Sequence, residues 1–171
     1  MATSQGKGKK RKKEFVKLHA IADDKVPIFL SARVTKGYYG DALQFNTVLQ
    51  QVDPSIQTGD VCGDPAYLSR EIVSIVEEKG GQAIIKLKTG IPLKAKGYFA
   101  WVKMLTLARE KPKEYEKRNH RRSVIEGYFG GLKTRLVSKI RSKRRHNQNI
   151  EPLLKVVVWN ALVLTRYCAR K

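Results

Sequence analysis

The chain has 171 residues, a length that suits one domain rather than two. Lysine and arginine number 35 against 15 acidic residues, a formal net charge of +20, and hydrophobic residues make up 42%, which excludes a wholly disordered chain. The two cysteines, Cys62 and Cys168, have no paired spacing, which excludes a disulfide scaffold or zinc ribbon. No apolar run is long enough for a bilayer and no secretory signal is recognisable, so we expect a cytoplasmic protein without a membrane partner.

The positive charge is concentrated in two clusters without acids. Residues 7–13 read KGKKRKK, so residues 1–13 are interpreted as a basic flexible arm. One such cluster would be an ordinary solubilising surface, but two in one small chain favour binding to DNA or RNA. The second cluster lies between residues 127 and 150 and consists of Lys133, Arg135, Lys139, Arg141, Lys143, Arg144 and Arg145.

The first half of the chain reads as strands joined by helices. Alternation predicts strands over 15–22 and 28–35, and the turn at 23–25 makes them an antiparallel hairpin. Helical spacing then predicts a helix from Asp41, which can cap it, to about residue 51. A brief strand over 60–63, a helix capped by Ser69 and ending at Lys79, and a strand over 82–87 predict a parallel pair.

The second half reads as helices, over 99–110, 122–136 and 152–168, the last beginning after Asn147 or Asn149. The whole is therefore a mixed α/β domain. The helix over 122–136 turns an apolar stripe toward the core, which consists of Ile125, Tyr128, Phe129, Leu132 and Leu136.

Two carboxylates stand out as candidate metal ligands. Asp64 follows the strand over 60–63, and Pro65 holds it extended, although position alone favours an ordinary turn. Glu126 shares one helix face with Arg122 and Lys133, at about 100° of rotation per residue. A glutamate between two cations stays ionised, as a ligand for a hard metal ion must, while a surface ion pair of Arg122 with Glu126 explains the same spacing.

Glycines at 127, 130 and 131 lie in the same predicted helix. Each glycine costs a helix up to about 1 kcal/mol relative to alanine. Their presence indicates close approach of another group, for which a DNA strand is one candidate.

Several of these segments resemble the DDE transposases of bacterial and archaeal insertion sequences, from about Phe15 to the end of the chain. FVKLHAIAD resembles the family's second strand, GDPAY (63–67) the segment with the second catalytic aspartate, and NQNIEPLLKVVVWNALVL the closing helix. The family's late signature is tyrosine, two residues, arginine, three residues, glutamate, six residues, lysine. Arg122, Glu126 and Lys133 fit this spacing, with Asn119 in the tyrosine position.

The resemblance implies a ribonuclease-H-like mixed sheet flanked by helices, and cutting and joining of DNA with two divalent ions, Mg²⁺ or Mn²⁺. Asp64 and Glu126 would be catalytic metal ligands, and Arg122 and Lys133 would position DNA. The remaining cations of the second cluster would hold the DNA backbone without reading sequence. The implied partners are transposon ends and target DNA, with a homo-oligomer as a further expectation.

The family's first aspartate lies on a strand before the one near Phe15, and this strand is central in the family's sheet. The fourteen residues before Phe15 are basic and contain no aspartate. We therefore expect residues 14–171 to form a partial catalytic domain without its first, central strand and with two unpaired strand edges. Asp23 and Asp24, on a hairpin turn, are poor substitutes.

Three hypotheses follow. The first is a truncated or split transposase, whose N-terminal half is separately encoded or lost. The second is a non-catalytic DNA-binding remnant of the same fold. The third is an unrelated basic RNA-binding protein, which leaves GDPAY and the late signature unexplained.

Overall fold

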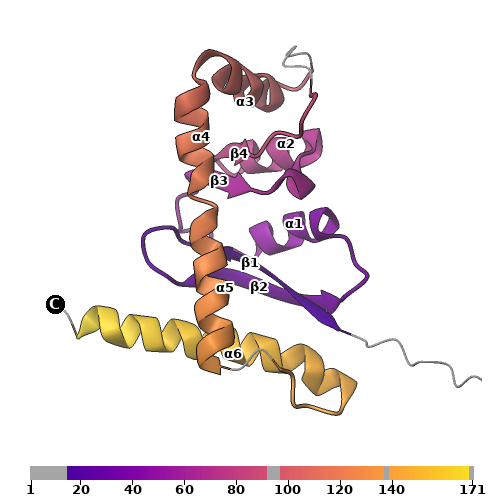
Figure 1. Ribbon diagram of the computed structural model, residues 1–171, viewed down its shortest axis with the longest axis vertical. Coiled ribbons are helices and arrows are strands. Elements are labelled where there is room, and N and C mark those ends of the chain that lie inside the picture. Colours follow the sequence, from indigo (N-terminus) through magenta and orange to yellow (C-terminus); the bar gives the residue numbers. More distant parts are fainter. Residues whose placement is uncertain (1–14, 92–96, 137–138, 170–171) are drawn as a thin grey trace, which may run out of the picture.

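The computed structural model describes residues 15–91, 97–136 and 139–169, and its first elements form an antiparallel hairpin (Figure 1). Strand β1 (Val16–Ala22) pairs with β2 (Phe29–Lys36), within one residue of the bounds that the alternation predicts. In the turn, Asp23 Oδ1 accepts hydrogen bonds from the backbone N–H groups two and three residues further on, at 2.8 and 2.7 Å. The predicted hairpin is confirmed. The predicted basic arm, residues 1–13, lies outside the described residues.

Helix α1 (Asp41–Gln50) packs against the hairpin. The prediction that Asp41 caps this helix is wrong, because Gly40 takes the N-cap position and Asp41 is the first helical residue. The Asp41 carboxylate instead accepts a hydrogen bond from Lys17 Nζ at 3.2 Å. Its side chain therefore ties the helix to β1.

A strand–helix–strand unit follows, as predicted. Strand β3 (Asp60–Gly63) leads through a 3₁₀ turn, η1 (Pro65–Tyr67), into α2 (Arg70–Glu78), and β4 (Gln82–Ile85) returns parallel to β3. Ser69 caps α2 through its Oγ, which accepts the Ile72 N–H at 3.1 Å. The second strand ends two residues earlier than predicted.

Of the late helices, α3 (Phe99–Glu110) has the predicted bounds, whereas α4 (Pro112–His120) was not predicted. The segment of α4 is almost entirely polar, so it carries little apolar periodicity. Its anchor is Tyr115, which is buried and donates a hydrogen bond from its hydroxyl to Ile85 O at 2.6 Å. Tertiary contact, rather than a local apolar stripe, fixes this helix.

The last two helices pack across each other and against β2 (Figure 1). Helix α5 (Ser123–Leu136) begins one residue later than predicted, and α6 (Arg145–Cys168) begins well before the predicted start at Pro152. Pro152 lies inside α6 and is buried, so a proline does not mark the beginning of this helix. Trp159 Nε1 donates to Pro27 O at 2.6 Å and fastens α6 to the hairpin.

The described part of the chain has two apolar cores. The larger packs α1, α2 and α3 around β4 and includes Leu49, Val76, Ile84 and Met104. The smaller joins β2 to α5 and α6 and includes Phe29, Leu132, Val156 and Trp159. The predicted inward stripe of α5 is confirmed, because all its members belong to the smaller core or pack against it.

The strands form two separate two-stranded sheets rather than one mixed sheet. One sheet is β1–β2 and the other is β3–β4, and Figure 1 shows them one above the other with α4 and α5 running past both. In the described ranges no strand lies on the second edge of β1 or of β3. The expected mixed sheet is therefore present, in the described ranges, only as two separate pairs of strands.

Candidate active site

Asp64 lies directly after β3, at the point where the strand turns into η1. Its backbone is extended, with φ −73° and ψ 162°, as expected for a residue that precedes proline. Its side chain is 55% exposed. The strand therefore fixes the position of the backbone and leaves the carboxylate oxygens accessible.

Glu126, in the first turn of α5, meets Asp64 at a shared arginine. Arg122 Nη1 donates to Asp64 Oδ1 at 2.5 Å and to Glu126 Oε1 at 3.1 Å. Two carboxylates that are distant in sequence thus contact one nitrogen atom. The sequence analysis also allowed a simple surface ion pair between Arg122 and Glu126. This ion pair is present, and Arg122 forms a second ion pair with Asp64.

The end of α4 places the start of α5 against the ends of β3 and β4. Asn119, which occupies the tyrosine position of the late signature, is buried, and its Nδ2 donates to Ile84 O at 2.7 Å. The Arg122 N–H donates to Asn119 O at 3.0 Å. An asparagine here therefore bonds directly to the sheet, and through the next turn it holds the arginine that binds both carboxylates.

A second charged cluster, which the sequence did not predict, lies at the beginning of β3. Arg118 bonds Asp60 through two guanidinium nitrogens, Nε at 2.8 Å and Nη2, and Arg121 bonds both Asp24 and Asp60. The hydrogen bond that Arg118 donates to Asp60 raises the pKa of Arg118, and the one that Arg121 donates to Asp24 raises the pKa of Arg121. Arg118 lies in the unpredicted α4, so no pattern paired it with Asp60.

Two other reactive side chains near the site are structural. Burial raises the pKa of the Cys62 thiol to about 11, and its Sγ donates to Arg118 O at 3.2 Å, so it stays protonated. Burial lowers the pKa of His19, whose Nε2 lies 2.8 Å from Thr35 Oγ1.

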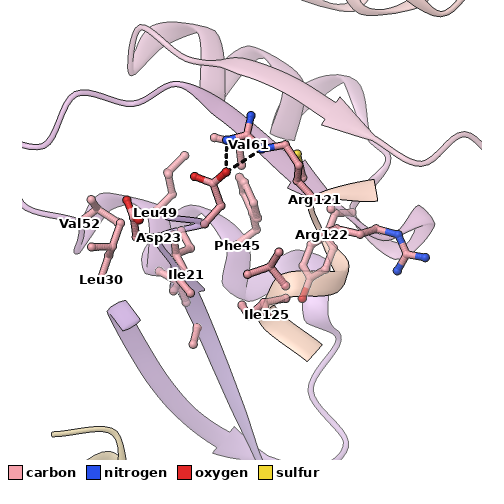
Figure 2. Close-up of a pocket in the computed structure, with 18 of the residues that line it drawn as sticks. Ile21, Asp23, Leu30, Phe45, Leu49, Val52, Val61, Arg121, Arg122 and Ile125 are labelled. Carbon is pink, nitrogen blue, oxygen red and sulfur yellow. Dashed lines mark hydrogen bonds and ion pairs between the residues drawn. The ribbon is translucent and has the colours of Figure 1, made fainter. Parts of the chain in front are cut away.

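A cavity of about 490 Å³ lies between the two sheets. Residues of β1 and β3 line it, together with residues of α1 and α5, and Figure 2 shows apolar side chains beside the charged groups of Asp23, Arg121 and Arg122. Asp64, Glu126 and Arg122 belong to the same lining. The apolar side chains labelled in Figure 2 are Ile21, Leu30, Phe45, Leu49, Val52, Val61 and Ile125.

Arg122, which is predicted to bind DNA, lies beside the carboxylates. The other residues predicted to bind DNA lie at the C-terminal end of α5, in the segment that connects α5 to α6, and at the start of α6. The connection is held by Glu151, whose Oε2 accepts the N–H groups of Arg141 at 3.0 Å and Ser142 at 2.9 Å. Ten residues of helix separate Glu126 from the end of α5, about 15 Å at 1.5 Å per residue. The predicted residues other than Arg122 are Lys133, Arg135, Lys139, Arg141, Lys143, Arg144 and Arg145.

Asp64 and Glu126 supply the carboxylate oxygens that Mg²⁺ and Mn²⁺ prefer. Among the described residues, however, no group of three or more acidic, histidine or cysteine side chains could hold a metal ion. Asp23 caps the hairpin turn and Asp24 binds Arg121, so each has another role. The pair fits part of a metal site, and the described residues do not complete one.

Comparison with known protein families gives a match over most of the chain. The family model described as Transposase DDE domain matches residues 2–161. No curated protein and no solved structure matches the chain significantly. In the described part of the chain, no helix is long and apolar enough to cross a membrane.

Proposed function

The chain belongs to the transposase DDE family, and from this premise we propose that it takes part in cutting and joining DNA phosphodiesters during transposition of an insertion sequence. DDE transposases use divalent metal, and we assign Asp64 and Glu126 as two of the three carboxylates that hold two Mg²⁺ or Mn²⁺ ions. The observation that supports this assignment is the meeting of both carboxylates at Arg122. Because the described residues provide only two ligands, no reaction step is assigned to this chain alone.

The proposed path of the DNA runs along α5. Lys133 follows Glu126 by seven residues, which places both on one face of the helix. The basic segment that connects α5 to α6 begins about 15 Å further along the helix axis. This length spans roughly four phosphates of one DNA strand, which follow each other at about 3.4 Å along the DNA axis. DNA held in this way would be bound through its backbone, without contacts that read the sequence.

The described residues do not supply the third carboxylate. The family implies a ribonuclease-H-like fold, and the two small sheets are then the two sides of its sheet, separated where a central strand belongs. A transposase split into two polypeptides, or truncated, explains this arrangement. The cavity between β1 and β3, which also borders Asp64 and Glu126, supports it.

A second candidate function is a DNA-binding remnant without catalysis. It is favoured by Arg122, whose positive charge bridges the two carboxylates and neutralises part of the charge that would attract a metal ion. An unrelated RNA-binding protein is no longer a candidate, because the family is shown.

Cleavage separates a self-sufficient enzyme from these alternatives. The purified chain is incubated with supercoiled plasmid and Mg²⁺ or Mn²⁺, and we expect no nicking, because one ligand is missing. Nicking that disappears in Asp64→Ala would show that the chain has a complete site.

DNA binding is tested by its dependence on salt. Affinity for a fluorescent duplex should fall steeply between 50 and 200 mM salt, because each neutralised phosphate releases counterions. Replacing Lys139, Arg141, Lys143 and Arg144 with alanine should flatten the slope by about one for each phosphate that is no longer neutralised. The control, Lys113→Ala with Lys117→Ala on α4, should leave the slope nearly unchanged, and equal effects of both variants would contradict the proposed path.

The proposal includes self-association through α6. This helix buries Val156 and Trp159 on one side, while Leu154, Val157 and Leu164 on the other are 46–62% exposed. With Ile150 and Ala161, these residues follow the alternating three- and four-residue spacing of a heptad seam. If the chain dimerises through this seam, Val157→Glu should shift the sedimentation coefficient from that of a dimer to that of a monomer. Arg166→Glu, which lies off the seam, should leave the sedimentation coefficient unchanged.

A further inference from the structure

The connection between β2 and α1 carries two exposed tyrosine rings that stack on each other. The ring centroids of Tyr38 and Tyr39 lie 4.9 Å apart, and the ring planes are inclined by 22°. Tyr38 is 75% exposed and Tyr39 is 42% exposed. Neither ring belongs to the two apolar cores of the described residues. Tyrosines grouped on a surface are typical of places that bind another molecule, because the ring is apolar and its hydroxyl tolerates water.

Hydrogen bonds hold the backbone of this connection against the start of β1. The Gly37 N–H donates to Phe15 O at 2.8 Å, and the Tyr39 N–H donates to Lys36 O at 3.1 Å. From β1, Lys17 Nζ donates to Tyr39 O at 3.1 Å. Because the backbone is already held, a ligand that binds the rings loses little free energy in ordering the loop.

A small cavity of about 250 Å³ adjoins Tyr39, and residues of β2, α1 and α6 line it. Among the described residues of this lining, Arg33 and Lys36 are cationic and none is acidic. Lys36 Nζ also lies 5.7 Å from the centroid of the Tyr38 ring. Aromatic rings and cations therefore meet at one surface.

We propose that this surface binds one unpaired nucleotide of a DNA strand, with its base stacked on Tyr38 and its phosphate held by Arg33 and Lys36. Aromatic rings beside cations are the combination with which proteins bind single-stranded nucleic acid, since every base has a face that stacks. Gln44 and Asn149, which also line the cavity, have amide donors for phosphate or sugar oxygens. Paired bases inside a duplex are already stacked on their neighbours, so the ligand is an unpaired nucleotide.

The lysine over the ring does not block this site. A cation over an exposed ring is held weakly, because water solvates both partners. A base can replace the Lys36 ammonium over Tyr38, and the ammonium then pairs with the phosphate of the same nucleotide. The contact between Lys36 and Tyr38 thus places a cation where the nucleotide needs one.

The tyrosines adjoin both regions of the molecule to which the proposed function assigns DNA. Asp41, two residues after Tyr39, lines the larger cavity together with Asp64. Asn149, in the lining of the small cavity, lies one turn after Arg145, the last member of the second basic cluster. Figure 1 shows the end of β2 and the first part of α6 on the same side of the molecule. A strand that runs from the basic segment toward Asp64 can therefore pass the tyrosines. The identity of the ligand as DNA rests on the proposed function.

The test uses the full chain and two fluorescent DNAs, a blunt duplex and the same duplex with a single-stranded tail of four nucleotides that contains 2-aminopurine. Tails on the 3′ and 5′ strands are both measured. Stacking on an aromatic ring quenches 2-aminopurine, so we expect saturable quenching. The chain should bind the better tail about fivefold more tightly than the blunt duplex. Absence of quenching with both tails would overturn the proposal.

An abasic tail separates base stacking from phosphate binding. It carries the same phosphates without bases, so the tail with bases should bind about fivefold more tightly than the abasic tail. Equal affinities would mean that only phosphates are bound, and the proposal would fail. Free dAMP at the concentration of the tailed duplex should leave that duplex bound. Displacement by dAMP would identify a free nucleotide as the ligand and would equally overturn the proposal.

Variants of Tyr38 test the ring itself. Tyr38→Ala should weaken binding of the tailed duplex about fivefold and remove the quenching, whereas Tyr38→Phe keeps the ring and should keep both. Leu43→Ala is the matched control, because Leu43 lies in the first turn of α1 and is 76% exposed, and its affinity should equal that of the unchanged chain. If Tyr38→Ala alters the sedimentation coefficient but not the affinity, the tyrosines contact a protein, contrary to the proposal. The comparison of the tails uses the unchanged chain and does not depend on the folding of any variant.

The nucleotide site and the proposed path along α5 can fail separately. Replacing Lys139, Arg141, Lys143 and Arg144 with alanine should weaken binding of the blunt and tailed duplexes alike, whereas Tyr38→Ala should weaken only the tailed duplex. Unchanged duplex affinity in the basic variant, with the quenching retained, would contradict the path along α5 and support the nucleotide site. Unchanged affinity of Tyr38→Ala for the tailed duplex, with a loss in the basic variant, would overturn the nucleotide site and support the path.

Discussion

Two acid–arginine clusters stand at opposite ends of β3, and they differ in exposure. Asp60, at the start of the strand, is 16% exposed and receives two hydrogen bonds from Arg118. Asp64, just past the end, is 55% exposed and shares Arg122 with Glu126, which is 64% exposed. The ion-pair chemistry is the same, but the first cluster is partly withdrawn from water and the second is open to it.

This difference suits a structural role for the cluster at Asp60 and the proposed metal-binding role of Asp64 and Glu126. An exposed ion pair contributes little to stability, because water screens it and the side chains lose freedom. Arg122 can therefore leave Asp64 and Glu126 at low cost when another cation arrives. Arg118 cannot leave Asp60 so easily, since a partly buried carboxylate would lose its donors.

The largest expected effect follows from the cluster at Asp60. Asp60→Asn should destabilise the fold by about 2 kcal/mol, because charged hydrogen bonds to Arg118 are lost in a partly buried setting. Asp64→Asn should change stability by less than about 0.5 kcal/mol. Urea unfolding at neutral pH measures both. Equal losses in the two variants would remove the distinction between the clusters.

Sequence reasoning found the exposed cluster and missed the partly buried one for a physical reason. Asp64 and Glu126 stand in short motifs whose spacing a family resemblance can supply. Asp60 and Arg118 are joined only by the packing of α4 against β3, and α4 has almost no apolar periodicity. Local patterns predict strands and amphipathic helices well, but they do not show which polar helix reaches which strand.

The glycines of α5 also bear on the difference between structural and proposed functional positions, because they lie on the helix that carries Glu126. A Cβ at Gly131 would lie 2.5 Å from Trp159 Cη2, whereas a Cβ at Gly130 would meet nothing within 4 Å. Packing against Trp159 thus explains Gly131 without DNA, contrary to part of the sequence interpretation. Gly130 lies four residues after Glu126, so it remains a candidate for close approach of DNA.

Gly131→Ala should destabilise the fold by about 1 to 2 kcal/mol through overpacking, and Gly130→Ala should stabilise it by up to about 1 kcal/mol through helix propensity. If DNA passes over the open side of α5, Gly130→Ala should also weaken DNA binding while raising the melting temperature. Thermal unfolding and fluorescence anisotropy on the same samples separate the two effects. Unchanged DNA affinity would mean that the DNA does not approach this position closely.

The separation of the strands into two sheets was foreseen in part, through the missing central strand. Alternation over 15–22 gives a strand and its faces, but it does not say whether the outer edge of that strand is paired. The length of the first strand and the parallel pairing of the second sheet are local properties, and both were predicted. The cavity between the sheets is lined by residues of β1, β3, α1 and α5, and no local pattern encodes how these distant segments come together.

The smallest effect concerns Glu151, a carboxylate far from the candidate metal site, which binds the basic segment between α5 and α6. Hydrogen bonds from Lys155 and Ser142 lower the pKa of Glu151 to about 2 from its ordinary value of 4.5. Because the pKa is lower in the folded state, its stabilising contribution is complete above about pH 4.5 and is lost as the pH falls toward 2. Glu151→Gln should therefore be less stable than the unchanged chain at pH 7, and the difference should shrink by pH 3.

Urea unfolding of the two proteins at both pH values measures this change, with Glu116→Gln on the exposed side of α4 as the control. The same variant tests whether the basic connection needs its anchor to bind DNA. If Glu151 only orders the connection, the affinity for DNA falls while the salt slope stays the same, because the same phosphates are neutralised. A flatter slope would mean that the cations leave the DNA when the connection loosens, and the proposed path along α5 would then depend on Glu151 as much as on the cations.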